Sequence, residues 1–229
     1  DIMIQACSMD DQVTFHAIHN LIRPFRDIVQ VKWTQTGFVS GQLHETPRNL
    51  MAFKDGTVNP RHTDEYKDYV FIDDGWAKNG TYCIIRRIQI HIETWDRTAL
   101  EEQEATFGRK RISGAPLTGK KEFDEMDLGA KDSSGEYVIP ADAHARLAHE
   151  AKTSIKRRAY NYTAGTNDKT GALETGLLFI SFQKATQQFI DIQNHLGHKD
   201  KLNEYITHRA SATFIVLPGV KKGRSESTR

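Results

Sequence analysis

The sequence predicts an α+β fold built on antiparallel sheets, and two observations support this prediction. Segments with strand-type alternation and segments with helix-type periodicity follow one another closely along the chain. The order strand, helix, strand near the beginning of the chain returns near its end, which indicates two related units. The chain is long enough for this plan, because 229 residues that are 38% hydrophobic can bury one substantial core or two small ones sharing a surface.

The first part of the chain predicts a strand, a helix and a second strand. Residues 1–7 form a short apolar stretch, and the apolar positions that follow lie on one face of a helix entered at Asp10 or Asp11. Pro24 is expected to end that helix, because proline lacks the amide hydrogen that a helix interior uses. A second strand is expected over residues 28–33. Together these elements would be the end of a first unit whose beginning is missing from the chain.

The rest of the chain predicts strand, helix, strand, strand, helix, strand. Apolar and polar residues alternate from Tyr82 to Ile92, and Thr98 with Glu101 forms a capping box for a helix that ends at Gly108. The later segments are an extended stretch over 155–162, a strand over 176–183, helical segments over 189–206 and a last strand over 212–217. This order is that of a ferredoxin-like unit, whose helices cover one face of an antiparallel sheet. We expect one complete ferredoxin-like unit and the end of another, arranged like a dimeric α+β barrel.

Two long segments do not fit this plan. Residues 40–79 and 109–154 are polar, contain many turn-forming residues and show little periodicity. Loops of this length inside a compact domain are usually functional or disordered. We expect a first domain over residues 1–60, which ends within the first long loop, and a second domain over residues 61–229 that carries the functional site.

Three side chains in or beside these loops are candidates for chemistry. Asp55-Gly56 is a tight-turn dipeptide, so Asp55 alone is best explained as a turn residue. His144 alone is best explained as a surface histidine, and Arg157 leads with a second arginine into a predicted strand. Their combination, in segments outside the regular framework, nevertheless indicates a functional site.

Five blocks of sequence resemble, in order, the dye-decolourising peroxidase family from residue 4 to residue 220. The blocks are 47–60 (PRNLMAFKDGTVNP), 80–88 (GTYCIIRRI), 95–96 with 114–117 (WD and GAPL), 144–148 (HARLA), and 157–162 with 176–182 (RRAYNY and GLLFISF). Five blocks in order are specific where each alone is weak. The family's glycine-x-x-aspartate-glycine motif begins with Ala52 in this chain. If position 52 has a positive φ, this alanine strains the loop by about 1 kcal/mol.

The resemblance implies a haem site on the candidate residues, with haem b as the cofactor. Asp55 would be the catalytic aspartate and Arg157 the distal arginine. His144 would be the proximal ligand of the haem iron. The further haem-contacting residues that the resemblance implies are Asn59, Phe179 and Arg146.

These residue types suit the cleavage of a peroxide. A neutral imidazole is a strong axial donor to haem iron and leaves the opposite face open. A carboxylate can move a proton from the inner to the outer oxygen, and a fixed guanidinium stabilises charge on the departing oxygen. Because the reference pKa of an aspartate is about 3.9, we expect an acidic optimum. Candidate relays for electrons from bulky donors, each better explained as a packing aromatic, are Tyr160, Tyr162 and Trp95.

The resemblance implies an enzyme that reduces hydrogen peroxide while it oxidises dyes or other organic donors. The subgroup that the chain resembles most is exported and is also described as deferrochelatase, so release of iron from haem is a second expected activity. Expected partners are the N-terminal part of the same protein and a second copy of the chain. Two alternatives stay open: a non-catalytic haem-binding or iron-extracting protein, in which Asp55 serves only its loop, and a fragment that binds a partner chain but no haem.

Other patterns indicate no separate function. A formal net charge of +1 argues against nucleic-acid binding. The sequence also lacks an apolar run of about 18 residues, which is the length that a membrane span needs. His16 with His19, and His195 with His198, have metal-ligand spacing but lack a third ligand nearby. The basic run 109–111 is expected to complement the end of the preceding helix. The two cysteines, expected to be packing residues, are Cys7 and Cys83.

Overall fold

The computed structural model describes residues 1–41, 45–197 and 199–220, and the chain divides into two compact units after Thr36. The first unit holds helix α1 (Asp11–Ile22), which is followed by a 3₁₀ helix over Arg23–Phe25. The side chain of Asp10 caps α1 by accepting hydrogen bonds from the amides of residues 12 and 13, as the sequence predicted. Pro24 follows the end of α1 but lies inside the 3₁₀ helix.

The two strands expected in the first unit are absent from it. Residues 1–7 and 29–36 belong to no helix or strand. An apolar stretch predicts burial but does not supply a partner, and no neighbouring strand pairs with either segment inside this unit. The prediction of strands at these two places was therefore wrong.

The second unit contains the remaining elements. Its strands are β1 (Thr81–Ile90), β2 (Lys156–Arg157), β3 (Tyr160–Thr166), β4 (Leu173–Gln183) and β5 (Ile206–Val216). Its helices are α2 (Thr63–Tyr69), α3 (Ile92–Trp95), α4 (Leu100–Phe107), α5 (His144–Glu150) and α6 (Thr186–Leu196), with a 3₁₀ helix over Lys201–Glu204.

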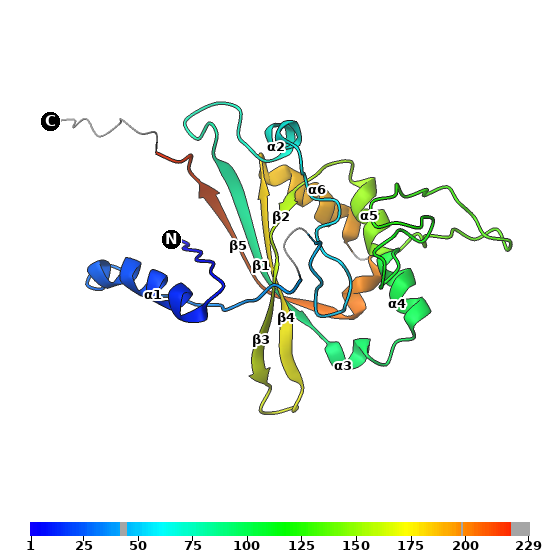
Figure 1. Cartoon of the computed structure of the whole chain (residues 1–229), viewed down its shortest axis with the longest axis horizontal. Coiled ribbons are helices and arrows are strands. Elements are labelled where there is room, and N and C mark those ends of the chain that lie inside the picture. The colour runs from blue at the N-terminus through cyan, green and yellow to red at the C-terminus, as the bar shows by residue number, and fades with distance from the viewer. Residues whose placement is uncertain (42–44, 198, 221–229) are drawn as a thin grey trace. The chain divides into compact units, whose positions relative to one another are not determined.

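The sheet of the second unit has ferredoxin-like topology. Strands run in the order β2-β4-β1-β5, β3 also pairs with β4, and every pairing is antiparallel. When β2 and β3 are counted as one interrupted strand, the spatial order is second, third, first, fourth, which is the order of a ferredoxin-like unit. Figure 1 shows α4, α5 and α6 on one side of this sheet. The predicted α+β class with an antiparallel sheet is confirmed; the division into domains at residue 60 stays a prediction.

Several element boundaries differ from the predicted ones. Ile92 begins α3 instead of ending the long strand, and α4 is preceded by an extended Ala99 in place of the expected Thr98 cap. The Thr98 hydroxyl instead donates backward to the carbonyl of Thr94 at 3.3 Å, because that acceptor lies one turn away in the preceding segment. Gly108 ends α4 with φ of +76°, as predicted. The helix expected across 202–206 is a 3₁₀ turn followed directly by β5.

The register of the sheet decides which side chains share a face. Directly opposed residues point to the same side, so Arg157, Ser181 and Ile84 form one row and Phe179 with Arg86 forms the next. The ring of Phe179 lies 5.9 Å from that of Phe189 on α6, which identifies this side as the helix-covered face.

A hydrophobic core lies at the end of β1 and includes part of the first long loop. Met51 and Phe53 from that loop are each 2% exposed and pack with Trp95. The ring of Phe53 stacks on Phe107 of α4, with centroids 4.1 Å apart. The first long loop is therefore tied to the core just before Asp55. Among the described residues, no helix has the length and apolarity that a membrane crossing would need.

Candidate functional site

The loop that carries Asp55 is held by its own side chains and by the core. The Asn49 side chain accepts hydrogen bonds from the amides of Met51 and Phe53, each at 3.1 Å. The turn between them places Ala52 at φ +68°, the left-handed conformation that favours glycine. The amide of Asp55 then donates to the carbonyl of Pro47 at 2.8 Å, which closes the loop on itself.

Asp55, Arg157 and Asn59 meet at one place. Nη1 of Arg157 lies 3.2 Å from Oδ1 of Asp55, and the two side chains keep 24% and 16% of their exposure. Asn59 binds the main chain of Arg157 from both sides: its Oδ1 accepts from the Arg157 amide at 2.8 Å, and its Nδ2 donates to the Arg157 carbonyl at 2.9 Å. The first long loop is thereby attached to the edge strand β2 at the residue that faces Asp55.

His144 is the first residue of α5 and has a carboxylate partner. Its Nδ1 lies 2.7 Å from Oδ2 of Asp200, whose side chain is only 3% exposed. The second oxygen of Asp200 accepts from the amide of Leu202 at 3.0 Å, which fixes the carboxylate. The ring of Phe107 packs edge-on against the imidazole at 6.1 Å. Because Nδ1 is engaged, Nε2 is the nitrogen oriented for a metal.

Asp200 was missed by the sequence analysis. It lies 56 positions beyond His144, and no motif joins the two. The available signal was chemical: a histidine that binds a metal usually donates its other nitrogen to a carboxylate or carbonyl. That rule predicts a partner without saying where in the sequence it is.

Phe179 and Arg86 lie on the same sheet face as Arg157. The Nη1 of Arg86 donates to Gln193 at 2.6 Å and its guanidinium stacks on Phe189, while its buried Nε has no hydrogen-bond partner among the described residues. Burial lowers the pKa of Arg86. The buried hydroxyl of Ser181, beside Arg157, also lacks a partner.

Arg146 is engaged by the second long loop. Its Nη1 donates to the carbonyls of Leu128 and Ile139 at 3.1 and 3.0 Å, and its Nε contacts Glu150 at 3.0 Å. Its guanidinium also stacks on Tyr137 at 4.5 Å. These contacts explain Arg146 as the anchor of that loop on α5, and its contact with haem stays a prediction.

Of the three aromatic relay candidates, Tyr162 and Trp95 are buried packing residues, and a relay role for any of the three stays a prediction. Tyr160 and Tyr162 alternate with Asn161, so they point to the sheet face opposite Arg157. Tyr162 is fully buried under the guanidinium of Arg87, 4.6 Å from the ring centroid. Trp95 is 2% exposed and donates to the Met51 carbonyl at 3.3 Å.

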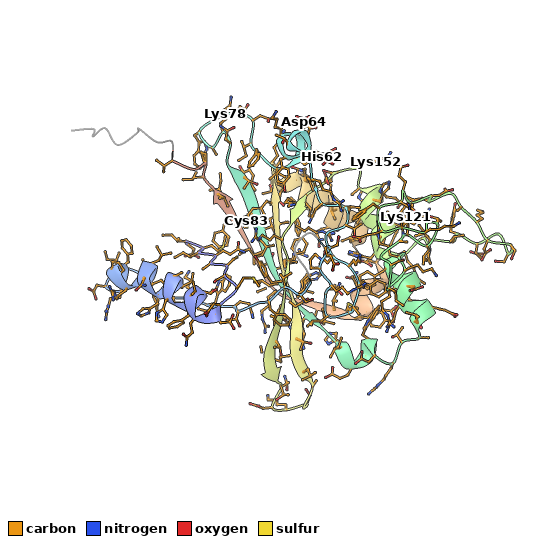
Figure 2. The ribbon with its side chains drawn as sticks, in the orientation of Figure 1. His62, Asp64, Lys78, Cys83, Lys121 and Lys152 are labelled. Carbon is orange, nitrogen blue, oxygen red and sulfur yellow. The ribbon has the colours of Figure 1, made fainter. Side chains whose placement is uncertain are left out.

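The remaining sequence patterns lie away from this site. Cys83 is buried within β1, where Figure 2 labels it, and burial raises the pKa of its thiol to about 11; Cys7 is exposed, so the packing interpretation was wrong for Cys7. Within the described residues, no three His, Cys, Asp or Glu side chains gather as a metal site. His16 and His19 both contact the ring of Phe15, whereas His198 lies outside the described residues.

The basic run after α4 has structural contacts. Lys110 pairs with Glu104 at 3.0 Å and the Arg111 guanidinium donates to Gln103 at 2.9 Å. Arg109 donates to the carbonyl of Gly114 at 2.8 Å, and burial, then the nearby charge of Arg157, lowers its pKa. These contacts support the structural interpretation of residues 109–111.

Two cavities lie beside the two long loops. Their volumes are about 530 and 350 Å³, and Glu122 and Phe123 line both. Asn59 lines the smaller one, whereas neither Asp55 nor His144 lines either cavity. These cavities are therefore adjacent to the candidate site but are not the place where its side chains meet.

The described residues fit a haem group in their chemistry. A histidine with a fixed carboxylate partner suits an axial ligand, and a half-buried phenylalanine suits the face of a flat apolar ring. The unpartnered Nε of Arg86 and hydroxyl of Ser181, on the face that carries Phe179, are donors that a carboxylate-bearing ligand could satisfy. Asp55 and Arg157 both keep partial exposure at their meeting point.

Comparison with known proteins gives the family. The model of the Dyp-type peroxidase C-terminal domain matches residues 46–221, and that of the N-terminal domain matches residues 1–39. Deferrochelatases of Yersinia pseudotuberculosis and Escherichia coli K12 are 37% and 36% identical to this chain over 96% of its length. The matched region covers 54% and 56% of these two relatives. The chain thus covers about half the length of these relatives.

Solved structures agree with this match. Ferric DtpA from Streptomyces lividans is 34% identical with a TM-score of 0.89, over 94% of this chain and 62% of that one. The DyP-type peroxidase from Cellulomonas bogoriensis is 35% identical with a TM-score of 0.88, over 95% of this chain and 63% of that one. From both kinds of comparison, the chain belongs to the Dyp-type peroxidase family.

Proposed function

We propose that this chain is the haem-carrying part of a peroxidase that reduces hydrogen peroxide while it oxidises an organic donor, with haem b as its cofactor. The observation that carries the proposal is the ion pair between Asp55 and Arg157, fixed by the two-sided contact of Asn59. A carboxylate and a guanidinium that touch each other and stay partly exposed can act together on one small polar substrate. When bound, haem supplies the redox-active iron at which the peroxide bond is cleaved.

His144 would hold the haem iron through Nε2. Its Nδ1 would keep its proton directed at Oδ2 of Asp200, which makes the imidazole a stronger donor and prevents the ring from turning. Phe179 would lie against the porphyrin, and Asn59 and Arg146 are the further proposed contacts. Arg146 would act by holding α5 and the second long loop together.

Asp55 would move the proton during cleavage of the peroxide. Its Oδ1 holds Arg157, so Oδ2 is the oxygen that would take the proton from the inner peroxide oxygen and return it to the outer one. The proton then leaves with a water molecule, and Asp55 ends in the form in which it began. The guanidinium of Arg157 would stabilise the negative charge that collects on the outer oxygen as the bond breaks.

The proposed electron donors, second activity, location and assembly rest on the resemblance to the relatives named above. Dyes and other bulky organic molecules are the proposed donors, with Tyr160, Tyr162 and Trp95 as proposed relays from the surface. The name deferrochelatase supports release of iron from haem as a second proposed activity. An exported location, association with the N-terminal part of the protein, and a homo-oligomer are proposed on the same resemblance.

Binding of haem is tested by absorption spectroscopy of the chain with added haem. The parent should develop a Soret band, and His144→Ala should lose it. His149→Ala, five positions along on the same short helix, should keep the band because that side chain has no place in the proposed site. Absence of a Soret band from the parent chain, alone and with the N-terminal part added, would contradict the proposal.

Catalysis is tested with Asp55→Asn in the haem-loaded chain. The substitution should retain the Soret band and slow the reaction with hydrogen peroxide about 100-fold or more, because the amide cannot carry the proton. This experiment also separates the proposal from a non-catalytic haem carrier, in which Asp55 serves only its loop. A variant that reacts with peroxide as fast as the parent would support the carrier.

A further inference from the structure

Glu122 contacts both sides of the turn that presents Asp55. Its carboxylate binds Nζ of Lys54, the residue before Asp55, through one oxygen. Its other oxygen accepts from the hydroxyl of Thr57, two residues after Asp55, at 3.1 Å. The turn from Lys54 to Thr57 is thus closed into a ring by a side chain that lies more than sixty residues away in the sequence.

The part of the loop that Glu122 closes is otherwise attached mainly through its main chain: Arg61 donates to the carbonyl of Thr57 at 2.9 Å, and the amide of Asn59 donates to the carbonyl of Gly56 at 3.0 Å. Up to Phe53 the loop is fixed by buried side chains and by the Asn49 cap. Beyond Phe53, the main chain of Asp55 is held by one hydrogen bond to Pro47, and Gly56 occupies φ +114°. Besides its ion pair with Arg157, the direction of the Asp55 side chain therefore depends on what holds the side chains of Lys54 and Thr57 on either side of it.

Glu122 is itself firmly placed. Its carbonyl accepts from Nη1 of Arg109 at 3.0 Å, and the same nitrogen donates to Gly114 at 2.8 Å. The carboxylate is 10% exposed and its partner Lys54 is 22% exposed, so the pair is largely shielded from water. Lys121, labelled in Figure 2, marks the part of the second long loop from which Glu122 projects.

The charge of Glu122 also determines where the Lys54 ammonium lies. An ammonium next in sequence to Asp55 could pair with that carboxylate and compete with Arg157. While Glu122 holds the ammonium, Asp55 keeps Arg157 as its partner at 3.2 Å. Two effects, orientation of the turn and removal of a competing cation, then act on the same side chain.

We propose that Glu122 is a positioning residue for Asp55, which holds the turn from both sides and keeps Lys54 away from the catalytic carboxylate. This inference rests on the proposed peroxidase function, because it concerns the residue to which that function assigns the proton transfer. Glu122 does not touch the reacting atoms in this scheme. Its contribution is made through Lys54 and Thr57.

The first test measures the second-order rate of the haem-loaded chain with hydrogen peroxide by stopped-flow absorbance. Glu122→Gln should lower this rate at least tenfold while the Soret band and haem affinity stay within twofold of the parent. Glu125→Gln, on an exposed residue of the same loop, should leave the rate unchanged. Lys54→Met should remove most of the difference between Glu122 and its glutamine variant, because the cation that Glu122 restrains is then absent.

The second test needs no haem and no activity, so it separates a failure of this inference from a failure of the proposed function. Hydrogen exchange at the amides of Asp55 and Asn59 should accelerate at least tenfold in Glu122→Gln and should keep the parental rate in Glu125→Gln. Thr57→Val, which removes one contact and leaves the ion pair, should give a smaller acceleration in the same amides.

Each result of these two tests either supports or overturns the proposed role of Glu122. A Glu122→Gln chain that exchanges the loop amides at the parental rate overturns the proposal, whether or not the parent reacts with peroxide. Equal acceleration in Glu125→Gln also overturns it, because the change would then come from the charge of the loop and not from the contacts of Glu122. Faster exchange of the loop amides in Glu122→Gln but not in Glu125→Gln, together with slower peroxide reaction wherever the parent reacts, supports it.

Discussion

Ala52 has a side chain where the backbone favours glycine. With φ of +68° it lies in the left-handed region, and the turn there is fixed by Asn49 and by the buried residues on either side. The strain remains because the surrounding contacts determine the backbone conformation more strongly than the alanine does.

Ala52→Gly should therefore raise the free energy of unfolding by about 0.5–1 kcal/mol, because glycine adopts this φ without a Cβ penalty. Chemical denaturation of the two chains measures the difference. Ala105→Gly, in the middle of α4, is the matched control and should lower the free energy of unfolding by about 1 kcal/mol. A loss of stability in the first variant similar to that in the control would show that position 52 does not strain the loop.

The carboxylate behind His144 gives a second prediction for a single residue. Asp200→Asn keeps the shape of the side chain but removes the charge that faces Nδ1 at 2.7 Å. Haem affinity should fall about tenfold, and the reduction potential of the bound iron should rise because a less electron-rich imidazole stabilises ferric iron less. Haem titration and spectroelectrochemistry measure both, with Asp191→Asn, a half-buried residue of α6 whose side chain accepts from Gln187, as control. An unchanged potential would show that Asp200 serves only the 3₁₀ turn at Leu202.

Individual residues of the site were predictable where they belong to short motifs. Asp55, His144 and Arg157 each stand in a block that resembles the family, and the condition stated for strain at position 52, a positive φ, is met by Ala52 at φ +68°. The residues that support them were not predicted, because Asp200 and Glu122 reach their partners across 56 and more than sixty positions. Hydrogen bonds between distant loops leave no periodic pattern in a sequence.

At the scale of elements, β4 depends on a close approach at Gly176. A Cβ built there would overlap the carbonyl of Ile88 on β1 and come within 2.7 Å of the Tyr162 hydroxyl and 2.8 Å of a Tyr162 ring carbon on β3. Gly176 lies on β4 directly opposite Gln89 and Tyr162, so both neighbouring strands converge on it. This glycine is needed for space and not for an unusual φ.

Gly176→Ala should accordingly lower the free energy of unfolding by about 2 kcal/mol or more, because strand pairing must open on both sides to admit a methyl group. Gly129→Ala, in the second long loop, is the matched control, since its nearest neighbour would be an aspartate oxygen at an ordinary 3.4 Å. Thermal unfolding followed by circular dichroism compares the two. Equal melting temperatures for the Gly176 variant and the parent would mean that the sheet has room the structure does not show.

Elements were predicted well where one pattern extended over many residues. The alternation in β1, the apolar run of β4 and the amphipathic α1 gave the right type of element in each case. Errors occurred where short segments depend on a partner: the two strands expected before Gly37 lack a ladder, and the extended stretch 155–162 is split into β2 and β3. The sequence predicted a long loop where helix α5 lies, because the seven residues of this helix are too few to show periodicity.

At the scale of the whole molecule, the second unit joins a regular sheet to two long loops through a small number of polar contacts. Arg48 donates to the carbonyls of Arg111 and Ile112 at 2.6 Å, and the Lys54–Glu122 pair makes the same connection nearby. Such contacts depend on charge, so the stability of the unit should depend on pH. Hydrophobic packing between the two loops would give no comparable dependence.

Glu122 determines the direction of that dependence. Burial alone would raise its pKa, but hydrogen bonds from Lys54, Thr46 and Thr57 outweigh burial and lower the pKa below the ordinary value of 4.5. A carboxyl whose pKa is lower in the folded than in the unfolded chain binds fewer protons when folded. Its contribution to stability is therefore complete above pH 4.5 and is lost as the pH falls through the folded-state pKa.

Glu122→Gln should lower the free energy of unfolding at pH 7 by about 2 kcal/mol, since it leaves a largely shielded ammonium without its partner. The difference between variant and parent should shrink as the pH falls below 4.5, because the parent then loses the same charge by protonation. Denaturation curves at pH 7, 5 and 3.5 measure both parts of this prediction. A difference that stays constant across that range would mean that the glutamate acts through its shape and its hydrogen bond to Thr57, and that the charge on Lys54 needs no counterion in the folded chain.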